Sequence, residues 1–189
     1  RKTLPLTSDF SLHPSLKNFH NAWNKGKASI IHSTNIPYKM RSHFEGQDLM
    51  ESGGHKPFAE YTGWLGRGME AAGLEGLAIA LPMPLILRSN ANLDNYFPTK
   101  LSTPSTDIMN KVASTYPQNS KLRETIKRIL MRPYSMLSGN GSRKAHRLAA
   151  TAAKALAKAD GPRVAVFDIN GFDTHAAQGG SNGDHADKL

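Results

Sequence analysis

Apolar residues recur at three- and four-residue spacing in several stretches of the chain, a pattern typical of amphipathic helices. In one stretch, Ser42 and Glu45 match a capping box, and Gly53 follows as a C-terminal stop. Gly26 and Gly73 close two others in the same way. The pattern predicts helices over residues 14–25, 43–52, 61–72, 107–116, 120–131 and 143–159.

Short apolar runs between these stretches predict strands. They cover residues 28–32, 77–81, 85–87 and 163–169, whereas residues 90–106 and 138–142 look irregular. The last run is almost continuously apolar, as expected of a parallel strand covered on both faces. It follows the helix predicted over 143–159, so the two form half of a βαβ unit and predict an α/β fold.

Length and composition fit one α/β domain spanning residues 1–189. The chain has no cysteine, which excludes disulfide scaffolds, zinc ribbons, thiol catalysis and iron–sulfur ligation. No apolar stretch approaches the roughly 18 residues of a membrane span, so no span is predicted. The net charge of +9 makes phosphate esters, polyanions and acidic surfaces candidate partners.

The segment after the last predicted strand carries the first candidate site, because ligands gather at the carboxyl ends of parallel strands. Asp173 and His175 are two residues apart, so in an extended segment both side chains reach one metal ion. Gly171 allows a sharp backbone turn before them. The alternative, in which Asp173 caps a turn and His175 bonds to the backbone, stays open. His185 adds to this group only if residues 179–183 fold back.

A second candidate site lies at the start of the helix predicted over 43–52. Ser42 stands at a helix N-terminus, where unpaired N–H groups and the helix dipole favour phosphate, sulfate or an alkoxide nucleophile. Arg41 is a potential oxyanion clamp, and His43 a potential base. Taken alone, however, Ser42 is expected to be a structural cap and His43 a surface residue.

Basic residues mark the helices predicted over 120–131 and 143–159. Solvated faces of this kind are common, and no recognised nucleic-acid motif accompanies them, so no nucleic-acid partner is expected. The basic residues are Lys121, Arg123, Lys127, Arg128, Arg143, Lys144 and Arg147.

Five segments together resemble the domain-of-unknown-function family 1501, bacterial proteins of the alkaline phosphatase and sulfatase superfamily. The Ser-His-Phe and Phe-Asp-Thr-His portions are specific in combination, and the resemblance covers nearly the whole chain. The segments are Phe10-Ser-Leu-His-Pro-Ser-Leu16, Trp23-Asn-Lys-Gly26, Arg41-Ser-His-Phe-Glu-Gly-Gln-Asp48 continuing to Gly53, Gly63-Trp-Leu65 and Gly171-Phe-Asp-Thr-His175.

This resemblance implies a three-layer α/β/α sandwich with a mostly parallel central sheet and metals at the carboxyl ends of its strands. It gives Ser42 the nucleophile position and makes Asp173, with His175 or His185, a ligand group for a divalent ion such as Zn, Mn or Ca. It also implies export by a bacterium. Two family segments, an Asp-containing strand before this chain and a Glu-Phe-Gly-Arg and Asp-His region after it, are missing, so the chain is expected to be an incomplete portion of such a domain.

Two functions are consistent with these features. The first is a metal-dependent hydrolase of phosphate or sulfate esters, with an anionic small molecule or glycan ester as substrate. Arg41 and His43 would then contact the oxyanion or the substrate. The second is a non-catalytic alkaline phosphatase-like protein that binds an anionic ligand or acts as a surface scaffold.

Overall fold

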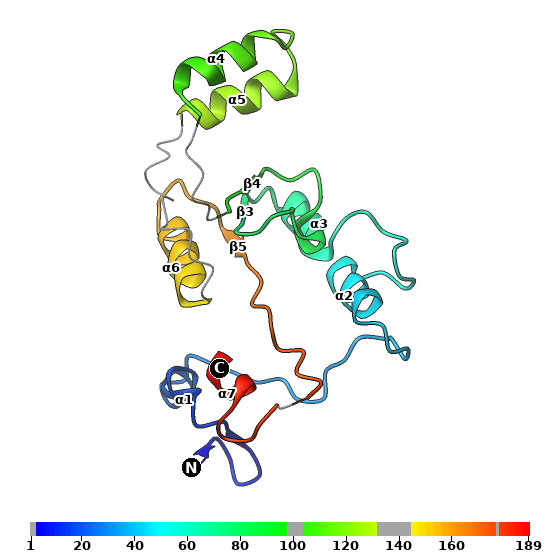
Figure 1. Cartoon of the computed structure of the whole chain (residues 1–189), viewed down its shortest axis with the longest axis vertical. Coiled ribbons are helices and arrows are strands. Elements are labelled where there is room, and N and C mark those ends of the chain that lie inside the picture. Colours follow the sequence, from blue (N-terminus) through cyan, green and yellow to red (C-terminus); the bar gives the residue numbers. More distant parts are fainter. Residues whose placement is uncertain (1–2, 98–103, 132–144, 177) are drawn as a thin grey trace. The chain divides into compact units, whose positions relative to one another are not determined.

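The computed structural model describes residues 3–97, 104–131, 145–176 and 178–189 (Figure 1). They belong to two compact units, one of Arg1–Pro37 with Ile169–Leu189 and the other of Tyr38–Asp168. The helices are α1 (Lys17–Asn24), α2 (His43–Ser52), α3 (Trp64–Ala72), η1 (Leu85–Leu87, 3-10), α4 (Thr106–Ser114), α5 (Lys121–Met131), α6 (Ala145–Leu156) and α7 (Asp184–Lys188). The strands are β1 (Leu4–Pro5), β2 (Ser11–Leu12), β3 (Gly76–Ala78), β4 (Leu93–Asn95) and β5 (Val164–Val166).

A parallel three-stranded sheet lies in the unit of residues 38–168, in the order β4-β3-β5. Leu77 of the central strand is in register with Asp94 of β4 and Ala165 of β5. One further hydrogen bond, from Ile79 N to Val166 O at 2.7 Å, continues the pairing past the end of β3. Helices and a parallel sheet in one unit confirm the predicted α/β class.

Alternating side chains of the central strand give this sheet two apolar faces, because successive strand residues point to opposite sides. Leu77 and Ile79 pack on one face with α6, through Leu148, Ala152 and Ala155. Ala78 packs on the other face with Met69 of α3 and Leu87 of η1. The sheet is therefore covered by α6 on one side and by α3 with η1 on the other.

Two glycines allow α3 to approach the backbone of η1. A Cβ at Gly63 would lie 2.2 Å from the Ile86 carbonyl carbon, and one at Gly66 would lie 2.4 Å from the Leu87 carbonyl oxygen. The Gly63 N–H donates to the Arg88 carbonyl at 2.9 Å in the same contact. At a third glycine, Gly68, a Cβ would meet no heavy atom within 4 Å outside the backbone of its own helix. The first two glycines are therefore required by close backbone packing, and the third is not.

Several predicted elements differ from the structure. The stretch Ala28–His32 forms no strand: its Ile31 side chain is exposed, and His32 stacks on Phe10 instead of entering a ladder. Leu85–Leu87 is a 3-10 turn because Pro82 and Pro84 provide no N–H for a ladder, and the Leu87 N–H bonds back to the Pro84 carbonyl. Conversely, β4 lies within the stretch predicted to be irregular.

The predicted helices are confirmed, and no described end differs from its prediction by more than three residues. The strand predicted over 77–81 is shortened to β3, and the one over 163–169 to β5. The predicted loop over 138–142 and the first two residues of the helix predicted over 143–159 lie outside the described residues.

The unit of residues 1–37 and 169–189 brings the N-terminal and C-terminal segments of the chain together. Its β1 and β2 pair antiparallel. The Ser15 hydroxyl donates to the Ala186 carbonyl at 3.2 Å, which fastens the turn before α1 to α7. In neither unit do the described ranges contain a helix long and apolar enough to cross a membrane.

Candidate functional site

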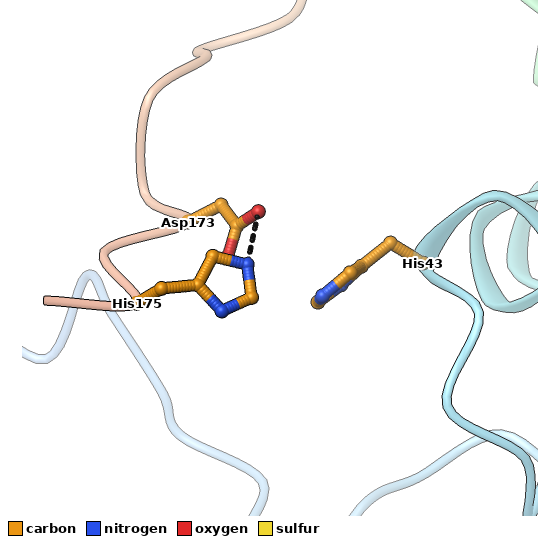
Figure 2. Close-up of side chains that lie close together, drawn as sticks. All are labelled: His43, Asp173 and His175. Atoms are coloured by element: carbon orange, nitrogen blue, oxygen red, sulfur yellow. Dashed lines mark hydrogen bonds and ion pairs between the residues drawn. The ribbon is translucent and has the colours of Figure 1, made fainter.

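Asp173 and His175 contact each other directly (Figure 2). The His175 Nε2 atom lies 2.8 Å from Oδ1 and 2.9 Å from Oδ2 of the Asp173 carboxylate. The Asp173 side chain is 59% exposed and the His175 side chain is 76% exposed, so solvent and solutes reach both. The two-residue spacing therefore does what the sequence predicts: it places a carboxylate and an imidazole on the same side of the chain.

The local backbone explains this pairing. Gly171 has a φ of 95°, in the left-handed region that favours glycine, so the chain turns just before the pair, as predicted. The strand predicted over 163–169 ends at Val166, however, and the boundary between the units falls after Asp168. The Asp-Thr-His segment therefore belongs to the unit of residues 1–37 and 169–189, which does not contain the parallel sheet.

The contact determines what the imidazole can do. When a carboxylate accepts the Nε2 proton of a neutral histidine, the ring is held in one tautomer with its lone pair on Nδ1. An oriented imidazole of this kind is suited to accept a proton at Nδ1, and a divalent cation that replaced the Nε2 proton would meet both the imidazole and the carboxylate. The carboxylate oxygens are themselves ligands for the same class of ion.

His185 has different surroundings. It lies in the first turn of α7, and its ring meets the ring of Phe172 edge-on with centroids 5.4 Å apart. Its backbone N–H donates to the Gln178 carbonyl at 3.4 Å, so the intervening 179–183 loop folds back. In the described part of the chain, His185 belongs to no group of three or more His, Asp or Glu residues whose ligand atoms lie within 4.8 Å of one another. The structure thus pairs Asp173 with His175 and packs His185 against an aromatic ring.

The structure places Ser42 as the N-cap of α2. Its Oγ accepts the Glu45 backbone N–H at 3.3 Å, and its backbone is extended, as a cap requires. The second half of the capping box is indirect: the Ser42 N–H donates to the Tyr38 hydroxyl at 3.3 Å, and that hydroxyl donates to the Glu45 carboxylate. Partial burial and the bond to Glu45 raise the pKa of Tyr38 above its usual value.

The neighbours of this serine are open to solvent. Arg41 is exposed before the helix, and His43 is its exposed first residue. Figure 2 also draws His43, which belongs to the unit of residues 38–168. The hydrogen bond from the Glu45 N–H to the Ser42 Oγ confirms the cap predicted at Ser42.

A further ionisable pair is not apparent from the sequence pattern. Partial desolvation and the negative charge of Glu51 raise the pKa of Asp168, which follows β5 and stays accessible to solvent. Glu51 is buried and accepts hydrogen bonds from Gln47 Nε2 at 2.7 Å and from the Ile86 N–H at 3.0 Å. The only sequence signal for this pair is that Asp168 is the single charged residue in the apolar run 164–169.

Comparisons with known proteins give no assignment. No family model matches the chain, and neither the curated proteins nor the solved structures include a match. The resemblance to family 1501 therefore stays a prediction that depends on the five quoted segments.

Proposed function

We propose that the chain belongs to a metal-dependent hydrolase of phosphate or sulfate esters with an alkaline phosphatase-like α/β/α fold. The observation that carries the proposal is the exposed contact between Asp173 and His175. These two residues would hold the divalent ion, and Ser42 would be the nucleophile. Arg41 and His43 would contact the anionic substrate.

The donor set supports the cation assignment. One carboxylate and one imidazole are ligands common to Zn and Mn sites, and both side chains are exposed enough to accept an ion. His175 is favoured over His185 as the imidazole ligand, because His175 touches the carboxylate. A bound divalent ion would supply positive charge for an oxyanion and lower the pKa of a coordinated hydroxyl.

The role of Ser42 depends on which of its hydrogen-bonding groups the cap occupies. Its Oγ accepts a hydrogen bond from Glu45 N with a lone pair, a bond that does not use the hydroxyl proton. The hydroxyl can therefore cap the helix and also give up its proton to a base. The neighbouring guanidinium of Arg41 adds a positive charge that suits a phosphate or sulfate group.

The second candidate, a non-catalytic protein that binds anionic ligands, is favoured by a different observation. Ser42 is fully accounted for as a cap linked to Tyr38 and Glu45, so the helix needs no catalytic reason for a serine there. In that case the chain would bind anions in a salt-sensitive manner without requiring a metal.

Metal binding by the full chain is the first test. Elemental analysis after loading with Zn, Mn or Ca should find a stoichiometric ion that is lost in Asp173→Ala and in His175→Ala. His185→Ala should keep the ion. The exposed residues Asp160 and His55 provide matched controls, Asp160→Ala and His55→Ala, which should also keep it. A folded wild-type chain without bound metal would contradict an ion held by Asp173 and His175 and would favour the non-catalytic candidate.

A further inference from the structure

The hairpin of α4 and α5 exposes apolar side chains that no described element covers. The two helices pack against each other, with Ala113 buried in α4. Besides Met131 at the end of α5, which is 82% exposed, four larger residues stay open to solvent on these helices. They are Ile108 at 52%, Val112 at 42%, Leu122 at 56% and Ile129 at 41% exposure.

Helical spacing groups these side chains. Ile108 and Val112 are four residues apart on α4, and Leu122 and Ile129 are seven apart on α5, so each pair lies on one side of its helix. Each helix of the hairpin therefore presents an apolar stripe that is exposed to solvent in this structure.

The opposite side of α5 is basic. The helix carries Lys121, Arg123, Lys127 and Arg128 against one acid, Glu124. An open hollow of about 560 Å³ lies over this side and is lined by Lys121, Glu124, Thr125, Lys127, Arg128 and Met131. The Arg128 guanidinium is held there by a 2.8 Å bond from Nη1 to the Asn92 side chain.

We propose that the α4–α5 hairpin binds to anionic membrane surfaces. A helix with a strongly segregated apolar stripe, low overall hydrophobicity and Lys and Arg on its polar side has the properties of helices that lie in the interface of a bilayer. The basic side complements phospholipid phosphates, and the exposed leucine and isoleucines enter the region of the acyl chains. A nucleic acid would complement the charge but not the apolar side chains. The proposal does not depend on the hydrolase.

Vesicle sedimentation of the full chain tests the binding. Wild type should sediment with equimolar phosphatidylglycerol and phosphatidylcholine vesicles, but not with phosphatidylcholine alone, and added salt should weaken the binding. Lys121→Gln combined with Lys127→Gln should weaken it by about thirtyfold. Lys17→Gln combined with Lys154→Gln removes the same charge from α1 and α6 and should weaken it much less.

The apolar contribution is tested separately. Leu122→Ser combined with Ile129→Ser should remove vesicle binding while circular dichroism shows an intact fold, and Ile31→Ser, at a more exposed isoleucine, should leave binding unchanged. Three results would overturn the proposal: no sedimentation of wild type, sedimentation that the lysine pair on α5 does not affect, or a dimer on a sizing column that Leu122→Ser dissociates. The dimer would mean that a second copy covers the apolar stripes.

Discussion

The Tyr38 hydroxyl donates a hydrogen bond to the Glu45 carboxylate, although the two residues lie on opposite sides of the start of α2 in sequence. The same hydroxyl oxygen accepts the Ser42 N–H. A direct capping box would connect Glu45 to Ser42 N without an intermediary. Here a phenol completes the connection, so the beginning of α2 depends on a residue that precedes it by five positions.

Replacing this phenol should change how the protein responds to alkaline pH. The pKa of Tyr38 is raised above 10.0, so the folded state retains the phenol proton to higher pH than the unfolded chain does. The stability that this retention contributes is present below pH 10.0 and is lost as the pH rises through the raised pKa. As the pH rises above 10.0, the free energy of unfolding of wild type should therefore fall relative to that of Tyr38→Phe. Urea unfolding at a series of pH values measures this difference.

A spectroscopic titration provides an independent measurement. Tyrosinate absorbance of wild type minus that of Tyr38→Phe should show one transition centred above pH 10.0. A transition at or below that pH would contradict the hydrogen-bonded arrangement at the start of α2.

The glycines of α3 should differ sharply in their response to alanine. Gly63→Ala and Gly66→Ala place a Cβ 2.2 and 2.4 Å from backbone atoms of η1, so each should cost about 1–3 kcal/mol or more of unfolding free energy. Gly68→Ala meets nothing within 4 Å and lies inside the helix, so it should stabilise the protein by about 1 kcal/mol. Chemical denaturation of wild type and the three variants measures these changes in unfolding free energy. A gain at Gly66 as large as the gain at Gly68 would show that helix propensity, not contact with η1, decides the outcome.

Local signals predicted the helices better than the strands. The ends of α2 were predictable because Ser42 and Gly53 act on the backbone next to them, and both do so in the structure. A strand, by contrast, depends on a partner that is distant in sequence. The three residues Leu93–Asn95 form β4 only because β3 lies beside them, since two of the three are polar.

The same distinction applies to the candidate site. The spacing of two residues predicted that Asp173 and His175 lie on the same side of the chain, and their contact shows that they do. The influence of Glu51 on Asp168 joins positions 117 residues apart, 168 − 51, and no local pattern encodes it. Side-chain chemistry within one turn or one extended segment was therefore predictable, and chemistry that depends on tertiary packing was not.

Neutralising Asp168 should stabilise the protein near neutral pH. Partial desolvation and the charge of Glu51 raise the pKa of Asp168 above 3.8, so the folded state binds its proton more tightly than the unfolded chain does. The contribution of Asp168 to stability is greatest below pH 3.8, and it falls as the pH rises through the raised pKa. Asp168→Asn should thus have a higher Tm than wild type near pH 7, and the difference should shrink toward about pH 3. Asp160→Asn, in the exposed turn after α6, controls for the loss of one negative charge; an equal Tm gain in both variants would mean that net charge is the cause.

Two of the serines that cap helices in the described residues separate a structural role from a catalytic one. Ser42 caps α2 and Ser105 caps α4, each accepting a backbone N–H at 3.3 Å. Ser42→Ala and Ser105→Ala should therefore lose similar stability, about 1 kcal/mol each. Turnover of p-nitrophenyl phosphate or sulfate with added Zn, Mn or Ca should disappear only with Ser42→Ala, because only that hydroxyl is proposed to attack the ester.

A third variant makes the comparison decisive. Ser42→Asn retains a side-chain oxygen that can cap the helix but has no hydroxyl to act as a nucleophile. It should be nearly as stable as wild type and inactive. Turnover that survives in Ser42→Asn but falls in Ser42→Ala would assign the serine to the cap alone, because activity would then follow the integrity of α2 and not the presence of a hydroxyl.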